Sequence, residues 1–422
     1  MQSTDNPLRR HARVLVAALT GTAVEFYDFY VFATATALVL GPLFFPASSP
    51  QAQAISAFMV FGLAFVARPV GAIAFGHFGD RVGRKATLVA SLLLMGASTV
   101  LIGFLPSHAA IGFAAPLLLC ILRFGQGFGL GGEWGGAALL TVENAPPGWA
   151  ARFGAAPQLG APIGFLFANG LFLLLGLTLS DAAFRDWGWR VPFIASAVLV
   201  ALGLWVRLRI GETREFAAAR DAAPPPRVPL ARLFARHAGA VLAGAAGVVA
   251  CFAIFYLATA FALSRATTAL GYSREHFLAL QLGANVFLAL GIVVAAIRAD
   301  ATSPRRVLAW GSAATVVLGL VFGTGLAGGA MAAFATLSAA LFVMGFVYGP
   351  LGAWLPTLFP VDVRYTGISI AFNTGGIVGG AVTPLAAQAL SEAGHAGAIG
   401  GILSAAGLLT LLGVTLARPA AR

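Results

Sequence analysis

Long apolar runs separated by short polar connections make up most of this chain. Each run reaches roughly 20 residues, the length at which a helix crosses the hydrocarbon core of a bilayer. Helices are expected because lipid leaves the open edges of strands without hydrogen-bond partners. The expected spans lie near residues 14–40, 52–78, 86–105, 111–142, 152–178 and 190–208 and, after a polar segment, near residues 238–263, 275–298, 306–325, 329–358, 365–390 and 396–417. The pattern therefore predicts an all-α integral membrane protein with twelve transmembrane helices.

The polar segment near the middle divides the twelve expected spans into two groups of six. It contains Pro224, Pro225 and Pro226, and three consecutive prolines cannot continue a helix. The chain is therefore expected to form an N-terminal six-helix bundle, a cytoplasmic central loop and a C-terminal six-helix bundle, at residues 1–210, 211–236 and 237–422. Repeated halves joined by a long loop are a known plan of transporters, with the substrate site between the halves near the middle of the membrane.

Composition and charge support the membrane assignment. Of the 422 residues, 59% are hydrophobic and 10% are charged, whereas soluble domains carry about a quarter charged residues. The net charge of +11 could suggest nucleic acid, but most basic residues lie between the apolar runs, and 20 of the 26 lie in alternate connections. That bias orients a bundle, so both termini are expected to be cytoplasmic and no nucleic-acid partner is expected.

The sequence shows no pattern of an enzyme or of a metal or cofactor site. Cys120 and Cys251 lie inside apolar runs, where they are expected to pack as small hydrophobic side chains. It contains no zinc-ligand spacing, no nucleophile elbow and no phosphate-binding P-loop, so no enzyme activity, no cofactor and no ATP-driven transport is expected.

Ionisable residues inside the spans are the main functional candidates, because each costs about 2.5–3.5 kcal/mol to insert. They are Glu25, Asp28, Arg68, Arg123 and Glu133, and all five lie in the first half. This asymmetry suggests that the first half handles protons, with Glu25, Asp28 and Glu133 as the carriers.

Two of these acids lie close together on the first span. Glu25 and Asp28 are three residues apart, so they are expected to share a helix face. Two carboxylates this close raise each other's pKa, and burial raises both further, so one of them is expected to titrate near neutral pH, as a proton carrier must. A second interpretation stays open, in which one carboxylate pairs permanently with Arg68 or Arg123.

Basic and amide side chains on spans two and four are candidates for binding an anionic substrate. Arg123, Gln126 and Glu133 can face one cavity, and Arg123 could hold a carboxylate through two hydrogen bonds or serve as a movable partner for an acid. The alternative is a permanent salt bridge inside the protein. Arg68 precedes Pro69, and its side chain could reach either the cavity or the membrane surface.

The second half offers neutral candidates for selecting the substrate, and Tyr30 joins them from the first half. For each of them, helix packing or anchoring at the membrane surface is an alternative role. They are Tyr256, Gln281, Asn285, Tyr348, Trp354, Asn373 and Gln388. A separate row of Gly127, Gly131 and Gly135 is expected to let a neighbouring helix approach closely.

The loop after span two contains Gly76, Asp80, Arg81, Gly83, Arg84 and Lys85. At these positions it resembles the ten-residue signature of the major facilitator superfamily. In that superfamily the loop latches the outward-open state, which implies a cytoplasmic gate here. The second-half copy keeps Asp300 but lacks the signature's glycine, so its latch is expected to be weaker or to depend on Arg364 and Asp362.

Further motifs resemble the metabolite:proton symporter family of bacteria. They are the run from Val24 to Tyr30, Ala67-Arg68-Pro69, Arg123 with Gln126, and the run from Gly131 to Gly135. The resemblance implies a multi-pass inner-membrane transporter, in a family that carries dicarboxylates, oxoglutarate, shikimate, citrate, proline or betaines.

These observations together predict proton-coupled symport of a small organic solute, most simply a carboxylate metabolite, by alternating access. The expected partners are the substrate, protons and the lipid bilayer, and the protein is expected to act as a monomer. Facilitated or outward transport, symport of a zwitterion such as a betaine or amino acid, and a membrane sensor built on a transporter fold remain alternatives.

Overall fold

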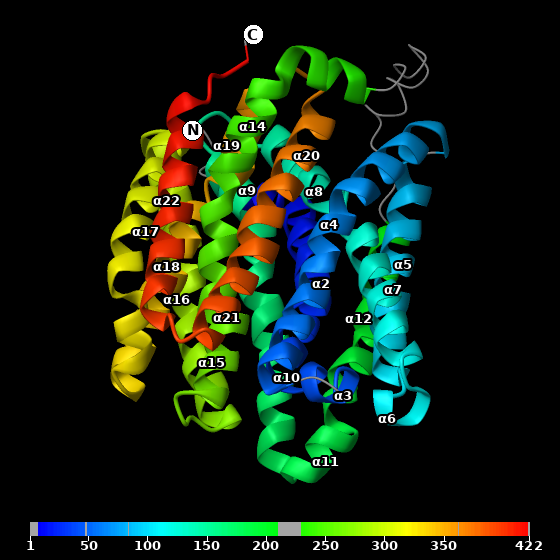
Figure 1. The fold of residues 1–422 in the computed structure, drawn as a ribbon. Helices are drawn as coiled ribbons and strands as arrows, with labels where there is room; N and C mark the ends of the chain where they lie inside the picture. The colour runs from blue at the N-terminus through cyan, green and yellow to red at the C-terminus, as the bar shows by residue number, and fades with distance from the viewer. Residues whose placement is uncertain (1–6, 47–48, 83, 210–228, 362, 421–422) are drawn as a thin grey trace.

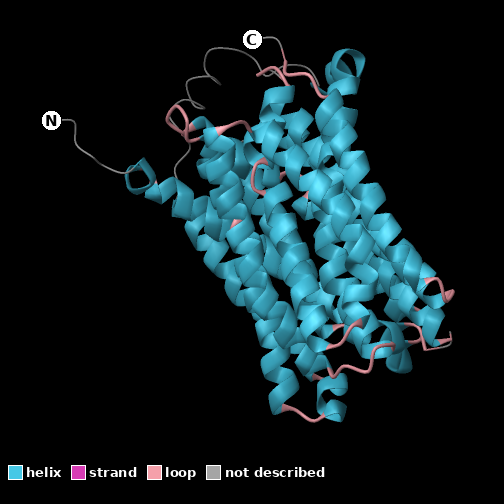
Figure 2. Ribbon diagram, turned by 90° about the vertical axis from the view of Figure 1, so that its left-hand side faces the viewer, coloured by secondary structure: helices cyan, strands magenta, loops and turns pink. Residues whose placement is uncertain are grey.

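The described chain folds into one bundle of long helices that run roughly side by side (Figures 1 and 2). A computed structural model describes residues 7–46, 49–82, 84–209, 229–361 and 363–420, and no strand occurs in those ranges. We call the end of the bundle where α2 begins and α22 ends the terminal end. Helices α6 (His108–Ile111) and α11 (Asp181–Asp186) lie at the opposite end (Figure 1).

The first half contains six spans, some of which are made of several consecutive helical segments. A short helix, α1 (Pro7–Arg10), precedes them. The spans are α2 (Ala12–Ala35) with the π-helical η1 (Thr36–Leu40) and α3 (Gly41–Phe44); α4 (Pro50–Val82); α5 (Arg84–Phe104); α7 (Ala114–Leu130) with α8 (Glu133–Glu143); α9 (Ala150–Gln158) with α10 (Gly160–Thr178); and η2 (Gly188–Arg190) with α12 (Val191–Arg209).

The second half repeats this plan. Its spans are α14 (Pro229–Tyr256) with the π-helical η3 (Leu257–Phe261) and α15 (Ala262–Thr268); α16 (Arg274–Ala301); α17 (Pro304–Ala327); α18 (Ala330–Tyr348) with α19 (Leu351–Trp354) and η4 (Leu355–Leu358); α20 (Arg364–Gly376) with η5 (Ile377–Val382) and α21 (Thr383–Glu392); and η6 (Ala396–Ala398) with α22 (Ile399–Leu416).

The all-α membrane architecture expected from the sequence is confirmed. Eleven helices in the described ranges are long and apolar enough to cross a membrane, and the shorter apolar stretch Val89–Phe104 of α5 supplies a twelfth. One boundary differs from expectation, because α14 begins at Pro229, inside the segment expected to be loop. Proline fits the first turn of a helix, and the helix is then kinked at His237, whose backbone is not helical.

Each half has its own packing, and a second set of contacts joins the halves. Within the first half α4 packs on α7 and α2 on α10, and within the second α16 packs on α18 and α17 on α22. Between the halves, α16 packs on α9 and α10, and α4 packs on α20, η5 and α21. The candidate residues lie on or beside these joining helices.

Glycines let α4 and α7 approach until their backbones touch. A Cβ atom at Gly71 would lie 1.9 Å from the backbone oxygen of Phe128, and one at Gly127 would lie 2.3 Å from that of Ala64. Real Cβ atoms do not approach backbone atoms so closely, so only glycine fits. In the glycine row expected to serve packing, Gly127 and Gly131 therefore face α4, whereas Gly135 faces Ser369 of α20.

A Gly71→Ala variant is expected to be less stable than the wild type by about 1–3 kcal/mol, the usual penalty for overpacking. Gly21→Ala is a matched control on α2, because a Cβ atom there has no neighbour within 4 Å. That change should leave stability equal or raise it by up to about 1 kcal/mol, because alanine favours a helix over glycine. Thermal unfolding of the two purified variants measures the difference, and equal midpoints would contradict the close approach.

Candidate functional site

The fourth span is interrupted where it faces the second half. Helix α7 ends at Leu130 and α8 begins at Glu133, so Gly131 and Gly132 form a turn between them. A break of this kind frees backbone carbonyls, which need other donors in an apolar surrounding. Here both donors come from α20 of the other half: Asn373 Nδ2 lies 2.8 Å from the Gly131 oxygen, and the Tyr365 hydroxyl lies 2.7 Å from the Gly132 oxygen.

The next residue, Trp134, joins four spans. Its ring stacks on Phe372 of α20, with the ring centres 3.6 Å apart. Its indole N–H donates to Gln158 Oε1 at 3.0 Å and to the Tyr348 hydroxyl at 3.2 Å. Gln158 in turn donates to the backbone oxygen of Tyr348. The turn and Trp134 therefore attach the first half to the second by hydrogen bonds and by ring stacking.

Arg68 is buried beside the second half. Its side chain is 5% exposed, and its guanidinium lies over the rings of Phe29 and Phe65, at 4.4 and 5.0 Å from their centres. Nε has no hydrogen-bond partner in the described part of the chain. The side chain therefore does not extend to the membrane surface, and it keeps an N–H group free to bind a ligand.

Aromatic rings from both halves surround Arg68. Phe61 and Phe65 of α4 pack against Tyr256 of α14, with ring centres 5.1 and 5.4 Å apart, and Phe65 also packs against Phe252. Phe65 reaches this position because Gly380 of η5 has no side chain to exclude it. The result is an aromatic wall across the boundary between the halves.

Glu25 and three tyrosines complete this region. Tyr30 stacks on Phe255 of the second half, with ring centres 4.8 Å apart. Glu25 lies near enough to Tyr30, Tyr256 and Tyr348 for its charge to act on all three, and Arg68 likewise acts on Tyr30 and Tyr256. We call these five residues, Glu25, Tyr30, Arg68, Tyr256 and Tyr348, the boundary cluster.

Arg123 lies on the first-half side of the boundary cluster and is fully buried, and its guanidinium lies over the same Phe29 ring as that of Arg68. Nε and Nη2 donate to the backbone oxygen of Phe61, at 3.4 and 3.2 Å, and Nη1 donates to Gln126 Oε1. The guanidinium also lies over three phenylalanine rings, those of Phe29, Phe32 and Phe61. All of these contacts are with neutral groups, so within the described part of the chain Arg123 is not held by the permanent salt bridge considered from the sequence.

Asp28 and Glu25 contact different neighbours, although the sequence places them on one face. The Asp28 carboxylate accepts hydrogen bonds from Ser196 of α12 and from Thr99 of α5, the latter at 3.3 Å. Gln126 donates to Thr99 and to the backbone oxygen of Asp28. Asp28 therefore belongs to a polar network inside the first half, whereas Glu25 belongs to the boundary. Three residues of helix turn a side chain by about 60° from its neighbour, which is enough to separate them.

Glu133 lies at the start of α8, next to the interruption. It is 7% exposed and accepts a hydrogen bond from Ser91 of α5 at 2.7 Å. The N-terminus of a helix favours a negative charge, because its backbone N–H groups point outward. Glu133 therefore lies between the polar interior of the first half and the turn that contacts the second half.

The neutral candidates of the second half divide into two kinds. Asn285, Asn373 and Tyr348 make contacts across the boundary, with Asn285 donating to the backbone oxygen of Pro162. Gln281, Trp354 and Gln388 make contacts within the second half. Gln281 donates to two carbonyls of the π-helical segment, Trp354 packs on Gly247, and Gln388 donates to Glu392.

The expected gate residues at the terminal end are described only in part. Gly76, Asp80 and Arg81 lie in α4 and Arg84 and Lys85 in α5, but their side chains, and all of Gly83 and Asp362, lie outside the described residues. Asp300 is described, and its carboxylate accepts three hydrogen bonds from the start of α9. The donors are the backbone N–H groups of Ala151 and Arg152, at 2.7 and 3.1 Å, and Arg152 Nε at 2.7 Å.

The second-half copy of the motif thus contacts the first half through Asp300 although it lacks the glycine. The Asp300 side chain is 4% exposed, and the Arg152 guanidinium also lies over the ring of Trp149. The negative charge of Asp300 faces the N-terminus of a helix, which adds to the attraction. Arg364, by comparison, lies 3.9 Å from Glu143, whose side chain is 59% exposed.

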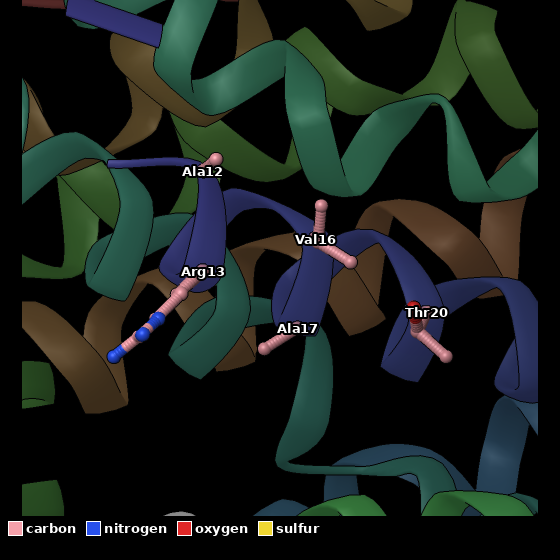
Figure 3. Close-up of a pocket in the computed structure, with 5 residues that line it drawn as sticks. All are labelled: Ala12, Arg13, Val16, Ala17 and Thr20. Carbon is pink, nitrogen blue, oxygen red and sulfur yellow. The ribbon is translucent and has the colours of Figure 1, made fainter. Parts of the chain in front are cut away.

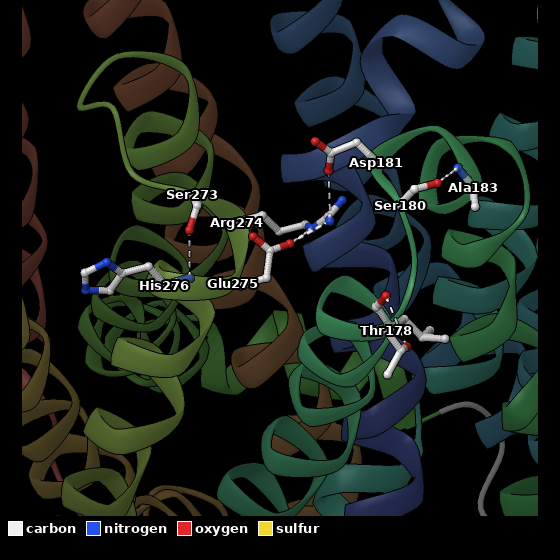
Figure 4. Close-up of polar contacts among 9 residues, drawn as sticks. Thr178, Ser180, Asp181, Ala183, Ser273, Arg274, Glu275 and His276 are labelled. Carbon is white, nitrogen blue, oxygen red and sulfur yellow. Dashed lines mark hydrogen bonds and ion pairs between the residues drawn. The ribbon is translucent and has the colours of Figure 1, made fainter.

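A second ion pair joins the halves at the opposite end (Figure 4). Arg274, at the start of α16, lies 3.2 Å from Asp181 of α11 and 2.6 Å from its own neighbour Glu275. Its guanidinium also covers the ring of Phe184. The fifth span, made of α9 and α10, is thus tied to α16 at one end through Arg152 of α9 and at the other through Asp181 of α11, which follows α10, so the halves touch at both ends.

A separate groove lies on the first turns of α2 (Figure 3). It is lined by Ala12, Arg13, Val16, Ala17 and Thr20, and it does not involve the boundary cluster. Within the described ranges, no three His, Cys, Asp or Glu side chains come together as a metal site would require.

Several residues of the site were not expected from the sequence. Trp134, Gln158, Phe372 and Tyr365 connect the halves, and Ser196 and Thr99 hold Asp28. The paired glycines before Glu133 were the one available signal, since two adjacent glycines weaken a helix. The other contacts join distant parts of the chain, which one sequence does not reveal.

Comparisons with known proteins agree with this architecture. A model of the sugar (and other) transporter family matches residues 13–224. The inner membrane metabolite transport protein YhjE of Escherichia coli is 46% identical over 97% of this chain and 94% of its own, and the shikimate transporter of Escherichia coli is 38% identical over 91% and 88%. The crystal structure of a D-xylose–proton symporter superposes with a TM-score of 0.75 at 19% identity, over 95% of this chain and 96% of that one.

Proposed function

The chain belongs to the metabolite transporters of the major facilitator superfamily, and from that premise we propose that it carries a small organic carboxylate together with protons. Its family makes it a secondary transporter rather than an enzyme, and a multi-pass protein of the inner membrane. The substrate class and the coupling to protons are the parts that we propose.

The position of Arg68 carries the proposal for the substrate. A buried guanidinium with a free N–H group, between the two halves of a transporter, suits a carboxylate, which accepts two parallel hydrogen bonds from arginine. Tyr256 of the second half lies close to Arg68, and both pack against the ring of Phe65, so a ligand there would be held by both halves. The shikimate transporter, a relative of this chain, is named for an organic acid.

Buried acids in the first half support the proposed coupling to protons. Asp28 accepts hydrogen bonds from Ser196 and Thr99, and Glu133 accepts one from Ser91, so hydroxyl groups of the first half contact both carboxylates. Glu25 lies in the cluster itself. A proton that moves among these three acids would change the charge beside Arg68 and, at Glu133, beside the turn that contacts the second half.

Alternating access is the proposed mechanism. Ion pairs at both ends of the contact between α16 and the fifth span hold the halves together here, and opening one end breaks the ion pair at that end. Opening at the terminal end also separates Trp134 from Phe372, and Asn373 from Gly131. The substrate site would then face one side of the membrane at a time.

Glu133→Gln is expected to abolish proton-driven accumulation of substrate while leaving exchange across the membrane intact, because the amide keeps the hydrogen bond from Ser91 but cannot release a proton. Reconstituted vesicles measure both activities: uptake against a gradient with an imposed pH difference, and counterflow without one. Glu143→Gln is the matched control at the exposed end of the same helix, and it should keep both activities. Unchanged uphill uptake by Glu133→Gln would remove Glu133 from the coupling.

A further inference from the structure

We infer that the transported solute is a monocarboxylate with a flat or cyclic body, and that dicarboxylates and tricarboxylates are rejected. This inference rests on the proposed function, because it takes the boundary cluster to be the place where the solute binds. Beyond that function, it specifies how many carboxylate groups the solute carries and what shape the rest of the solute has.

The number of carboxylates follows from the buried cations. In the described part of the chain, Arg68 and Arg123 are the buried cationic side chains. Arg123 is held by Phe61 and Gln126 inside the first half, and each of its nitrogens already has a partner. Arg68 alone combines burial, a position at the boundary and a nitrogen without a partner. One guanidinium with an unpartnered nitrogen matches one carboxylate.

A second carboxylate would lie in unfavourable surroundings. The remaining members of the boundary cluster are Glu25, which carries a like charge when ionised, and three tyrosines, whose hydroxyls are neutral. The other neighbours of Arg68 are the phenylalanine rings of the aromatic wall. A buried charge without a partner is strongly disfavoured, so a second carboxylate should weaken binding.

The shape of the body follows from the rings. Phe65, Phe252 and Tyr256 meet on one side of Arg68, and Tyr30 stacks on Phe255. Aromatic side chains bind flat groups well, by stacking on their faces or by edge contacts. The hydroxyls of Tyr30 and Tyr256 make no hydrogen bond among the described residues, so they are available to polar substituents on the same body.

Benzoate, phthalate and benzamide test this inference as probes of matched shape, with glycine betaine as a fourth. Their binding to the purified full-length protein is measured as a thermal shift over a range of concentrations, which yields relative affinities. Benzoate is expected to bind about tenfold or more tightly than phthalate and benzamide. In the Glu25→Gln variant the difference in affinity between benzoate and phthalate is expected to become smaller. The substitution removes a negative charge near Arg68 that would repel the second carboxylate of phthalate.

The possible outcomes separate this inference from the proposed function. Phthalate binding as tightly as benzoate, or aliphatic dicarboxylates binding more tightly, would overturn the inference and leave carboxylate transport standing. Glycine betaine shifting the transition while no carboxylate does so would overturn both. The wild-type measurement decides the question even if the Glu25 variant does not fold, and absence of a benzoate shift at millimolar concentrations overturns the inference.

Discussion

Replacing Arg68 by glutamine is expected to reduce substrate uptake by about 100-fold or more. Removing one partner of a buried, hydrogen-bonded charge pair costs about 2–5 kcal/mol, and 100-fold corresponds to about 2.7 kcal/mol. The loss of uptake should appear as weaker binding of the substrate, because Arg68 contacts the solute in our proposal. The fold itself should be little affected through Nε, since that nitrogen makes no hydrogen bond in the described part of the chain. Uptake into reconstituted vesicles and thermal shift with benzoate measure the two effects.

Two further variants give this prediction its controls. Arg68→Lys keeps the charge but loses the paired N–H groups of the guanidinium, so an intermediate loss is expected. Arg236→Gln removes an exposed positive charge on α14 and should leave uptake unchanged. If Arg68→Gln transported at the wild-type rate, the boundary cluster would not be the carboxylate site.

Arg123→Gln should behave differently from Arg68→Gln. The guanidinium of Arg123 is held by Phe61 and Gln126 and by three ring faces, so its removal leaves buried polar groups without partners. Loss of folded protein, rather than selective loss of binding, is the expected consequence. Comparing the two variants therefore distinguishes an arginine that binds the ligand from one that stabilises the fold.

Asp300→Asn is expected to open the terminal end of the protein, whereas Asp181→Asn is expected to change little. Asp300 is buried and accepts three hydrogen bonds from the start of α9. Breaking such a buried pair costs about 3–5 kcal/mol. This cost destabilises the conformation that is closed at the terminal end, because the pair forms only there. The Asp181 side chain is 86% exposed, and an exposed pair contributes about 0–1 kcal/mol.

Spin labels on exposed residues of the two halves measure this shift. Asn144→Cys and Thr302→Cys, in a protein whose Cys120 and Cys251 have been replaced, place one label on each half near the terminal end. Asp300→Asn should lengthen the distance between them in most molecules, and Asp181→Asn should leave the distribution close to that of the parent. A shift of equal size in both variants would show that burial does not set the strength of these contacts.

The sequence is sufficient to predict the architecture, because few kinds of structure can cross a membrane. Apolar runs of helical length predict the spans, and the glycines of α7 predict a close neighbour, which is α4. The start of α14 at Pro229 was missed because polar residues there suggest a loop, although they also suit a helix outside the hydrocarbon core.

The site could be predicted only as a set of residue types. The cost of inserting a charge identified Arg68, Arg123 and the three acids, and all five are buried. Their partners could not be predicted, because the contact of Asp28 with Ser196 joins residues 168 positions apart. The partners of Asp300 could not be predicted for the same reason, because they lie at the start of α9, which the local motif does not include.

The interrupted fourth span also makes transport depend on hydration. The oxygens of Gly131 and Gly132 accept hydrogen bonds from Asn373 and Tyr365 only while the halves are closed at this point. When the halves separate, water must enter and solvate these two oxygens in place of the lost donors, because bare carbonyls are not tolerated in an apolar medium. Each opening therefore takes up solvent as well as releasing solute, and osmotic stress opposes it by lowering the activity of water.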